Sequence, residues 1–483
     1  MSALQSFDIL IKGGSIVNGT GAPRFQADVG IVDDKIAAVG PLTDASAGRI
    51  IDASNKIVAP GFIDVHTHDD RILMTLPTMD MKVSQGVTSV VVGNCGISLA
   101  PLVAEHPPPP LDLIAEPGAC RFETFSQFLQ AIDMAPAAVN AAFLVGHSTL
   151  RVGVMDSLDR AASAIEIKKM RSMLEEGLAS GAIGFSTGLF YKPAAMAPTE
   201  EVVEIAMALK AFRGRYVTHM RDEGDDIILS LEETFRIGQD ARSPVIISHH
   251  KVHGRNNFGR SKETLACIDK HLAGHHHGIA FDVYPYVASS TVLKDDSIKV
   301  AERVLITWSK ARPELAGREL SDIADELNCD IYEAAAQLQP AGAIYFAMEE
   351  NDVQRILQHP HAMIGSDGLP HDEHPHPRLW GTFPRVLGHY CRDLKLFPLE
   401  EAVRRMTGYS AKTFGLKGRG LIADGYFADI TVFDEFSVLD SASFECSTRA
   451  AKGIEFVLVN GRSVWENGAT VGNRPGRVLR HGG

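Results

Sequence analysis

The chain has 483 residues, which is more than one small hydrophobic core supports, so we expect two or three domains or one large barrel with an appendage. Its 47 basic and 60 acidic side chains leave a formal charge of −13, which argues against nucleic acid or an anionic membrane surface as the main partner. A hydrophobic content of 45% with 22% charged residues is ordinary for a soluble globular protein.

The sequence also lacks signals for export and for membrane insertion. No run of about 18 or more apolar residues is present, so we expect no transmembrane helix. Residues 1–7 contain no basic segment followed by an apolar one, so we expect no secretory signal. The six cysteines are scattered and do not form a disulfide framework, which fits a reducing compartment. We therefore predict a cytoplasmic protein.

Both ends of the chain are rich in β-strand patterns. Near the N-terminus, two apolar runs within 27–40 flank Asp33-Asp34, which is typical of a hairpin. Near the C-terminus, 429–434 and 454–465 show strand–turn–strand patterns. The simplest arrangement joins 1–60 and 416–483 into one small β-sandwich domain.

The middle of the chain, 61–415, alternates short apolar runs with helix-like stretches. The candidate strands are Phe62–His66, Thr88–Val92, Ala142–Gly146, Ala182–Ser186, Val217–Met220, Val245–His249, Ile279–Val283 and Met363–Ser366. Eight strand–helix units predict an α/β fold, a (β/α)8 TIM-type barrel. In such barrels the active site lies at the C-terminal ends of the strands.

Polar and titratable residues follow most of these strands. They are His66 and His68, Asn94 and Cys95, His147, Ser186 and Tyr191, His219, His249 to Lys251, Asp282 to Tyr286, and Asp367. Alternation in a strand turns His66 and His68 to the same side, about 7 Å apart along the chain, where they can share one metal ion. The clustering at one rim predicts a metal-dependent site there.

One connection in the barrel is oversized. About 75 residues separate Tyr286 from the eighth strand, far more than a plain strand–helix connection needs. We interpret 288–348 as an insertion that can fold over the rim as a lid, the alternative being a decoration away from the site. The tract 275–277 of three histidines precedes a strand at the opposite end, so we expect a solvated loop there and not a metal site.

Several motifs resemble the amidohydrolase superfamily. The segments 7–14 and 59–68 are similar to its N-terminal signature, and 418–430 to its C-terminal one. Within it, Gly93-Asn94-Cys95-Gly96 and the segments 218–223, 248–251 and 365–371 resemble the N-acyl-D-amino-acid deacylases. The resemblance spans about 7–470 and implies a zinc-dependent hydrolase that acts on a small molecule, an N-acyl-D-amino acid.

The resemblance also implies a ligand set. Cys95, His219 and His249 would hold the tighter zinc ion, and His66, His68 and Asp367 a second, weaker one. The fourth strand has no lysine before Lys192, so a carboxylated lysine bridge is not expected, and Cys95 takes its place. Strand alternation alone does not choose between His249 and His250; the family match picks His249.

Roles in catalysis and substrate binding follow from the same match. Asp367 would carry a proton from water to the leaving nitrogen, although an Asx-turn before Gly368 is the plainer interpretation. Arg378 would clamp the substrate carboxylate, unless it forms a surface salt bridge. The remaining substrate-binding candidates are Tyr191, Lys251, Tyr284 and Met348.

Two alternatives to a deacylase stay open at this point. One is a cyclic-amide hydrolase of the hydantoinase or dihydroorotase type, which the Cys95 motif and the missing lysine disfavour. The other is a non-catalytic scaffold, which the complete set of ligand-type residues disfavours. The sequence does not determine the preferred side chain or acyl group, or the oligomeric state, for which a monomer is among the options.

Overall fold

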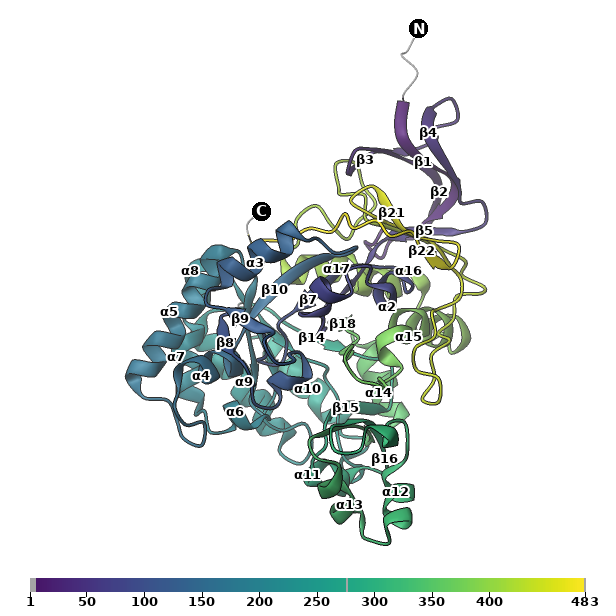
Figure 1. Ribbon diagram of the computed structural model, residues 1–483. Coiled ribbons are helices and arrows are strands. Elements are labelled where there is room, and N and C mark those ends of the chain that lie inside the picture. The colour runs from purple at the N-terminus through teal and green to yellow at the C-terminus, as the bar shows by residue number, and fades with distance from the viewer. Residues whose placement is uncertain (1–5, 275–276, 482–483) are drawn as a thin grey trace.

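A computed structural model describes residues 6–274 and 277–481 (Figure 1). Its centre is an eight-stranded parallel sheet in which consecutive barrel strands lie next to each other. The strands are β6 (Phe62–Asp64), β7 (Val87–Val92), β10 (Asn140–Gly146), β11 (Gly184–Gly188), β12 (Arg215–His219), β13 (Val245–Ile247), β14 (Ile279–Val283) and β18 (Ala362–Ile364). A parallel bridge between Thr67 and Gly368, beyond the ends of β6 and β18, brings the first and last strands together as a barrel.

The barrel strands are buried on both faces. In β13, Ile246 belongs to the apolar cluster that fills the barrel, whereas Val245 and Ile247 belong to the cluster between the strands and the helices. This alternation is the two-residue period of the pleat. Because both faces need apolar side chains, each strand is a short continuous apolar run, which is why such runs located the strands in the sequence.

Helices surround the barrel, and the longest of them, α5, carries a capping residue at each end. Ser163 accepts the backbone N–H of Glu166 at the start of α5, and Gly181 ends that helix at a φ of 119°. The helices of the barrel region are α1 (Ile72–Thr75), α2 (Asp80–Val83), α3 (Phe125–Met134), α4 (His147–Val154), α5 (Ala164–Ser180), α6 (Lys192–Ala195), α7 (Thr199–Ala206), α8 (Leu209–Phe212), α9 (Ile227–Ala241), α10 (Ser261–Leu272), α14 (Glu350–Gln358), α15 (Arg378–Arg385), α16 (Leu399–Met406) and α17 (Gly408–Phe414). A short hairpin, β8 (Leu102–Ala104) with β9 (Cys120–Phe122), extends the loop after β7.

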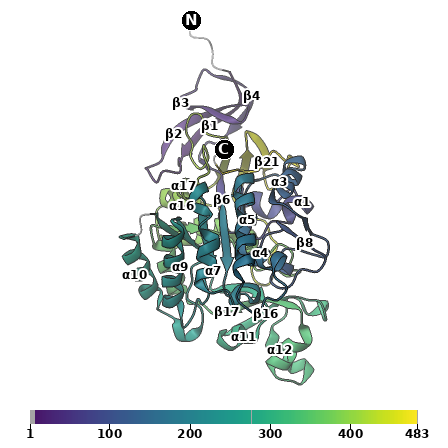
Figure 2. The ribbon, with the colours of Figure 1, turned by 90° about the vertical axis from the view of Figure 1, so that its left-hand side faces the viewer.

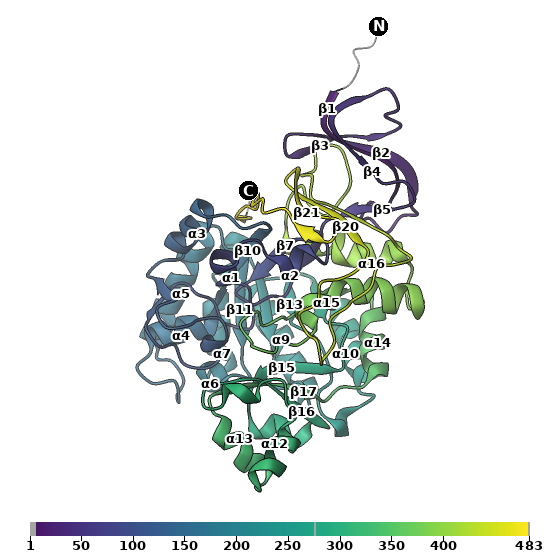
Figure 3. The same ribbon diagram turned by 45° about the vertical axis from the view of Figure 1, so that its right-hand side comes forward.

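The two ends of the chain build a second sheet (Figure 3). Its strands are β1 (Ser6–Ile16), β2 (Phe25–Val32), β3 (Lys35–Gly40), β4 (Ser46–Asp52), β5 (Ile57–Pro60), β19 (Ile430–Phe433), β20 (Ile454–Val459), β21 (Arg462–Glu466) and β22 (Ala469–Thr470). Antiparallel pairing of β5 with β19 joins the N-terminal strands to the C-terminal ones. Ile31 of β2 and Leu458 of β20 share one buried apolar cluster, so the two ends stabilise each other.

A third unit lies within the long connection after β14. It contains the antiparallel sheet β15 (Ala288–Val292), β17 (Ala341–Phe346) and β16 (Arg303–Ser309), with the helices α11 (Asp295–Val300), α12 (Leu320–Leu327) and α13 (Ile331–Leu338). These elements enclose an apolar cluster of their own. Figure 1 shows the unit at the end of the molecule opposite the terminal sheet.

The predicted fold class, a (β/α)8 barrel with a β domain from both termini, is confirmed. The domain limits stay a prediction. Of the three histidines at 275–277, the first two lie outside the described residues. Over the described part of the chain, no helix is long and apolar enough to cross a membrane.

Candidate active site

The predicted ligand residues converge at the C-terminal rim of the barrel. In one group, donor atoms of His66, His68, Cys95 and Asp367 all lie within 4.8 Å of one another; a second group joins Cys95 with His219 and His249 under the same limit. All six residues are buried. Cys95 belongs to both groups, so it sits between them.

Contacts at Cys95 are close. Its Sγ lies 3.3 Å from His66 Nε2 and 3.4 Å from His249 Nε2, and His249 Nε2 lies 2.9 Å from His219 Nδ1. Burial alone would raise the pKa of the Cys95 thiol, but the neighbouring His66 and His249 hold it well below its usual range. A thiolate surrounded by imidazoles is a donor set for a soft or borderline cation.

Three of the ligand residues adopt a left-handed backbone. Cys95, His249 and Asp367 have φ values of 53°, 36° and 50°. Such conformations cost on the order of 1–3 kcal/mol each for residues other than glycine, and they persist where the surroundings impose them. At Gly96, also at positive φ, a Cβ would lie 2.7 Å from the backbone nitrogen of Gly188, so no larger residue fits beside Cys95. The left-handed backbone after these strands thus directs the three side chains towards one another.

Asp367 links the metal-ligand groups to a cation. Its Oδ1 lies 3.1 Å from His68 Nε2 and 3.4 Å from His66 Nε2, and its Oδ2 lies 2.9 Å from Arg378 Nη1. Burial would raise the pKa of this carboxyl, but Arg378 and the histidines hold it well below its usual range. The carboxylate is therefore ionised at neutral pH.

Buried carboxylates behind the site orient the ligands. Asp282 accepts the backbone N–H of His249 at 2.8 Å and lies 3.2 Å from His66 Nδ1, which fixes the orientation of that ring. Asp64 accepts the Ser366 N–H at 2.8 Å and pairs with the buried Lys82 at 2.8 Å. Sequence reasoning assigned no role to Asp64 or Lys82. Ionisable residues within apolar segments are rarely buried without a partner, so they indicate a buried ion pair that can hold the ligand residues in place.

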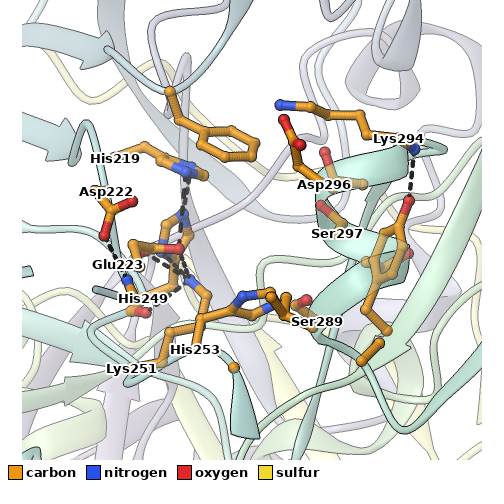
Figure 4. Close-up of a pocket in the computed structure, with 18 of the residues that line it drawn as sticks. His219, Asp222, Glu223, His249, Lys251, His253, Ser289, Lys294, Asp296 and Ser297 are labelled. Carbon is orange, nitrogen blue, oxygen red and sulfur yellow. Dashed lines mark hydrogen bonds and ion pairs between the residues drawn. The ribbon is translucent and has the colours of Figure 1, made fainter. Parts of the chain in front are cut away.

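Glu223 is a further charged group at the site that received no role from the sequence. It lies 2.7 Å from Lys251 Nζ and 3.0 Å from His249 Nδ1, and Figure 4 shows these three side chains together with His219. Burial would raise the pKa of Glu223, but Lys251 and His249 hold it well below its usual range. The available signal was its place in the segment that follows β12, four residues after His219.

A cavity of about 820 Å³ opens over the ligand residues. His68, His219, His249 and Asp367 line it, together with the predicted substrate-binding residues Tyr191, Lys251 and Tyr284. The insertion supplies Ser289, Lys294, Asp296 and Ser297 to the opposite wall (Figure 4). The insertion therefore lies at the site and not away from it.

Two predicted substrate-binding residues, Arg378 and Met348, lie behind the residues that line the large cavity. Arg378 is fully buried, 4.6 Å from the Tyr284 ring, and it donates to the backbone oxygen of Ser290 at 3.2 Å. Its Nε has no hydrogen-bond partner within the described residues. Met348 lies in a small separate cavity behind Lys251 and Tyr284. Neither side chain lines the large cavity.

Two rim histidines do not join the ligands. His147, after β10, lies 3.2 Å from Glu201, which also pairs with the buried Arg151. His250 points to the helix side of the barrel, 3.0 Å from Thr264 of α10. Both residues are structural, and His249, which the family match selected, is the one that meets Cys95.

The residues present fit a metal centre. Cys95 with His219 and His249 offers sulfur and nitrogen donors, the mixed set that zinc accepts. His66, His68 and Asp367 add nitrogen and oxygen donors beside the same thiolate. Within each group the donor atoms lie within 4.8 Å of one another, an arrangement that a shared cation would satisfy.

Comparisons with known proteins agree with this geometry. The family model described as "Amidohydrolase family" matches residues 49–256 and 273–465. D-aminoacylase from Alcaligenes xylosoxydans xylosoxydans is 57% identical over 98% of each chain. A crystal structure of D-aminoacylase, also 57% identical, matches 98% of this chain and 100% of its own with a TM-score of 0.96.

A second solved structure is N-acyl-D-glutamate deacylase from Bordetella bronchiseptica, in complex with zinc and a phosphonate inhibitor. It is 45% identical, and the match covers 99% of this chain and 100% of that one with a TM-score of 0.95. These likenesses extend over nearly the whole chain, and they confirm the resemblance predicted from the motifs. This chain belongs to the amidohydrolase family and, within it, to the N-acyl-D-amino-acid deacylases.

Proposed function

We propose that this protein is a zinc-dependent hydrolase that releases the free D-amino acid from N-acyl-D-amino acids. The observation that carries the proposal is the pair of ligand groups that share Cys95 at the floor of a substrate-sized cavity. The relatives named D-aminoacylase and N-acyl-D-glutamate deacylase, with their high identity over full length, support the substrate class.

Cys95, His219 and His249 would hold the tighter ion, and His66, His68 and Asp367 a weaker second one beside it. When bound, zinc supplies Lewis acidity, which polarises a carbonyl and makes water a better nucleophile near neutral pH. Asp282 holds His66 in one orientation, so the donor atoms are arranged before the metal binds.

Asp367 is assigned the proton transfer. Amide hydrolysis needs a base that takes a proton from the attacking water and an acid that returns it to the departing nitrogen. The carboxylate lines the cavity, is ionised, and lies next to His66 and His68, so it meets the geometric requirement.

The substrate carboxylate is assigned to a cationic corner. Lys251 and Tyr284 line the cavity, and Arg378 lies directly behind Tyr284 with an Nε that lacks a partner within the described chain. Tyr191 and the insertion form the walls around the amino-acid side chain, with Tyr191 bonded to Thr291 at 3.1 Å. We infer that the insertion 288–348 serves as a cover that limits access of water.

The test is to compare N-acetyl-D-methionine with N-acetyl-L-methionine, with and without a chelator. D-selective, chelator-sensitive release of acetate supports the reaction, the stereochemistry and the metal together. Hydrolysis of hydantoin or dihydroorotate in place of both would favour the cyclic-amide alternative. Bound zinc without any hydrolysis, including that of acidic N-acyl-D-amino acids, would favour a scaffold.

A further inference from the structure

Outside the cavity, the described residues bring together one further group of metal-ligand side chains: Glu232 on α9, with Cys267 and His271 on α10. The two helices lie side by side on the outside of the barrel (Figure 2). Cys267 and His271 are four residues apart, so both project from the same side of α10, where Glu232 faces them.

The three side chains converge to ligand distances. Glu232 Oε1 lies 3.8 Å from Cys267 Sγ, Glu232 Oε2 lies 3.0 Å from His271 Nε2, and all three donor atoms lie within 4.8 Å of one another. In a tetrahedral zinc site, bond lengths of about 2.0–2.3 Å place the donors about 3.3–3.8 Å apart. Small side-chain rotations therefore suffice to close the group around an ion.

The surroundings favour entry of an ion and hold the ligands in place. The His271 side chain is 26% exposed but its Nε2 is buried, whereas the Glu232 side chain is 46% exposed, so a cation would enter from solvent along Glu232 and keep water as its fourth ligand. The His271 ring stacks on Phe235 of α9 with centroids 4.3 Å apart, which keeps the imidazole beside Glu232. The donor set of sulfur, nitrogen and oxygen is one that zinc accepts.

We propose that Glu232, Cys267 and His271 form a peripheral binding site for a divalent cation of the zinc class, which cross-links α9 to α10. None of these residues lines the cavity or belongs to the ligand groups around Cys95. The site is therefore additional to the barrel centre and independent of the proposed reaction.

Binding at this site exchanges a proton for the ion. Without a cation, burial and the neighbouring Glu232 raise the pKa of the Cys267 thiol to about 11, so the protonated thiol donates to Glu232. When the metal–sulfur bond forms, that proton leaves to solvent.

The test is a titration of the zinc-loaded protein with Cd²⁺, followed by metal analysis and by the near-ultraviolet absorbance of cadmium–thiolate bonds. We expect the unmodified protein to bind one Cd²⁺ per chain more than Cys267→Ser or His271→Ala. Cys446→Ser, which changes an exposed cysteine elsewhere, should bind as many ions as the unmodified protein. Unchanged hydrolysis by the variants checks that the barrel centre is intact.

Equal Cd²⁺ counts and equal absorbance in the unmodified protein, Cys267→Ser and His271→Ala would overturn the proposal. Retention of the extra ion in His271→Ala alone would also overturn it, because Cys267 would then bind without its partners. Should either variant fail to fold, Glu232→Gln keeps the shape of the side chain and removes one charged ligand. Glu232→Gln should weaken Cd²⁺ binding at least about tenfold, which equals about 1.4 kcal/mol. Unaltered affinity for Cd²⁺ in this variant would contradict the three-ligand site.

Discussion

Arg378 and Asp367 form a buried ion pair, with Arg378 Nη1 2.9 Å from Asp367 Oδ2. The other oxygen of the carboxylate lies 3.1 Å from His68 Nε2. One carboxylate thus connects the arginine predicted to bind the substrate with a ligand group of the metal centre. The rest of the guanidinium lies behind Tyr284. Contact between Arg378 and the substrate carboxylate therefore requires either that the Tyr284 ring shifts or that the carboxylate binds Arg378 beside Asp367.

Arg378→Ala should raise KM for N-acetyl-D-methionine by about 10–100-fold, because charge-assisted hydrogen bonds contribute about 1.5–3 kcal/mol each. Arg378 also lowers the pKa of Asp367, so the variant should shift the acidic limb of the pH–rate profile to higher pH. Arg378→Lys, which keeps the charge but not the forked donor, should restore the pH profile more than KM. An unchanged KM with normal zinc content would contradict the assignment.

Cys95→Ala should lose the tightly bound zinc, because it removes the one donor that both ligand groups share. Cys120→Ala is the matched control, since Cys120 is an equally buried free thiol in β9. Metal analysis is best made in a Cys267→Ser background, so that the peripheral site does not contribute. Full zinc retention by Cys95→Ala would rule out its role as a ligand.

Asp367→Asn should lower kcat by about 10²–10⁴-fold, the usual contribution of a positioned acid–base group. The amide keeps the shape of the side chain but cannot accept a proton. Zinc at Cys95, His219 and His249 should remain, because Asp367 belongs to the other ligand group. Near-normal turnover by the variant would show that another group moves the proton.

The fold was predictable because barrel strands are buried on both faces and appear as short apolar runs. The alternation of side chains between the two faces of a strand was a less reliable guide to side-chain direction at the strand end. Val245 and Ile247 face the helices, so simple alternation would place His249 there too, and the motif match alone selected it. The φ of 36° at His249 turns its side chain to Cys95 instead. Backbone reversals of this kind leave no periodic pattern in a sequence.

The partners of residues that act by long-range pairing were also beyond sequence reasoning. Asp64 and Lys82 meet through a buried ion pair between β6 and α2, and Glu223 meets Lys251 across two loops of the rim. Neither pair has a fixed spacing, because it depends on which strands are neighbours in the closed barrel. Spacing predicts ligands within one short segment, such as His66 and His68 just beyond β6, whose rings lie 5.6 Å apart.

Lys294 should determine how well acidic substrates are accepted. Its Nζ lies over the Phe190 ring at 3.7 Å, that ring stacks on His219, and within the described chain no carboxylate pairs with this ammonium at salt-bridge distance. Lys294→Met should lower kcat/KM for N-acetyl-D-glutamate about tenfold relative to N-acetyl-D-methionine. Lys299→Met, on the same wall of the cavity, is the control. An equal effect on both substrates would exclude a role in side-chain selection.

Glu201→Gln should lower the free energy of unfolding, and because Glu201 does not line the cavity, the lining of the cavity should stay unchanged. Burial would raise the pKa of Glu201, but His147 and Arg151 hold it at about 2, below the ordinary value of 4.5. A depressed pKa contributes stability that is present above pH 4.5 and is lost as the pH falls towards 2; for a shift of this size the contribution is about 3 kcal/mol. The variant also leaves Arg151 buried without its carboxylate.

Urea denaturation of the unmodified protein and of Glu201→Gln checks this prediction. The gap between the two free energies of unfolding should be about 3–5 kcal/mol at pH 7. It should be nearly constant down to pH 5 and should narrow below pH 4.5, because protonation of Glu201 in the unfolded chain then removes the advantage of the ionised form. Glu200→Gln, whose side chain is 67% exposed on the same helix, should change stability little at either pH. A gap independent of pH down to 3 would show that Glu201 acts through packing and not through its charge.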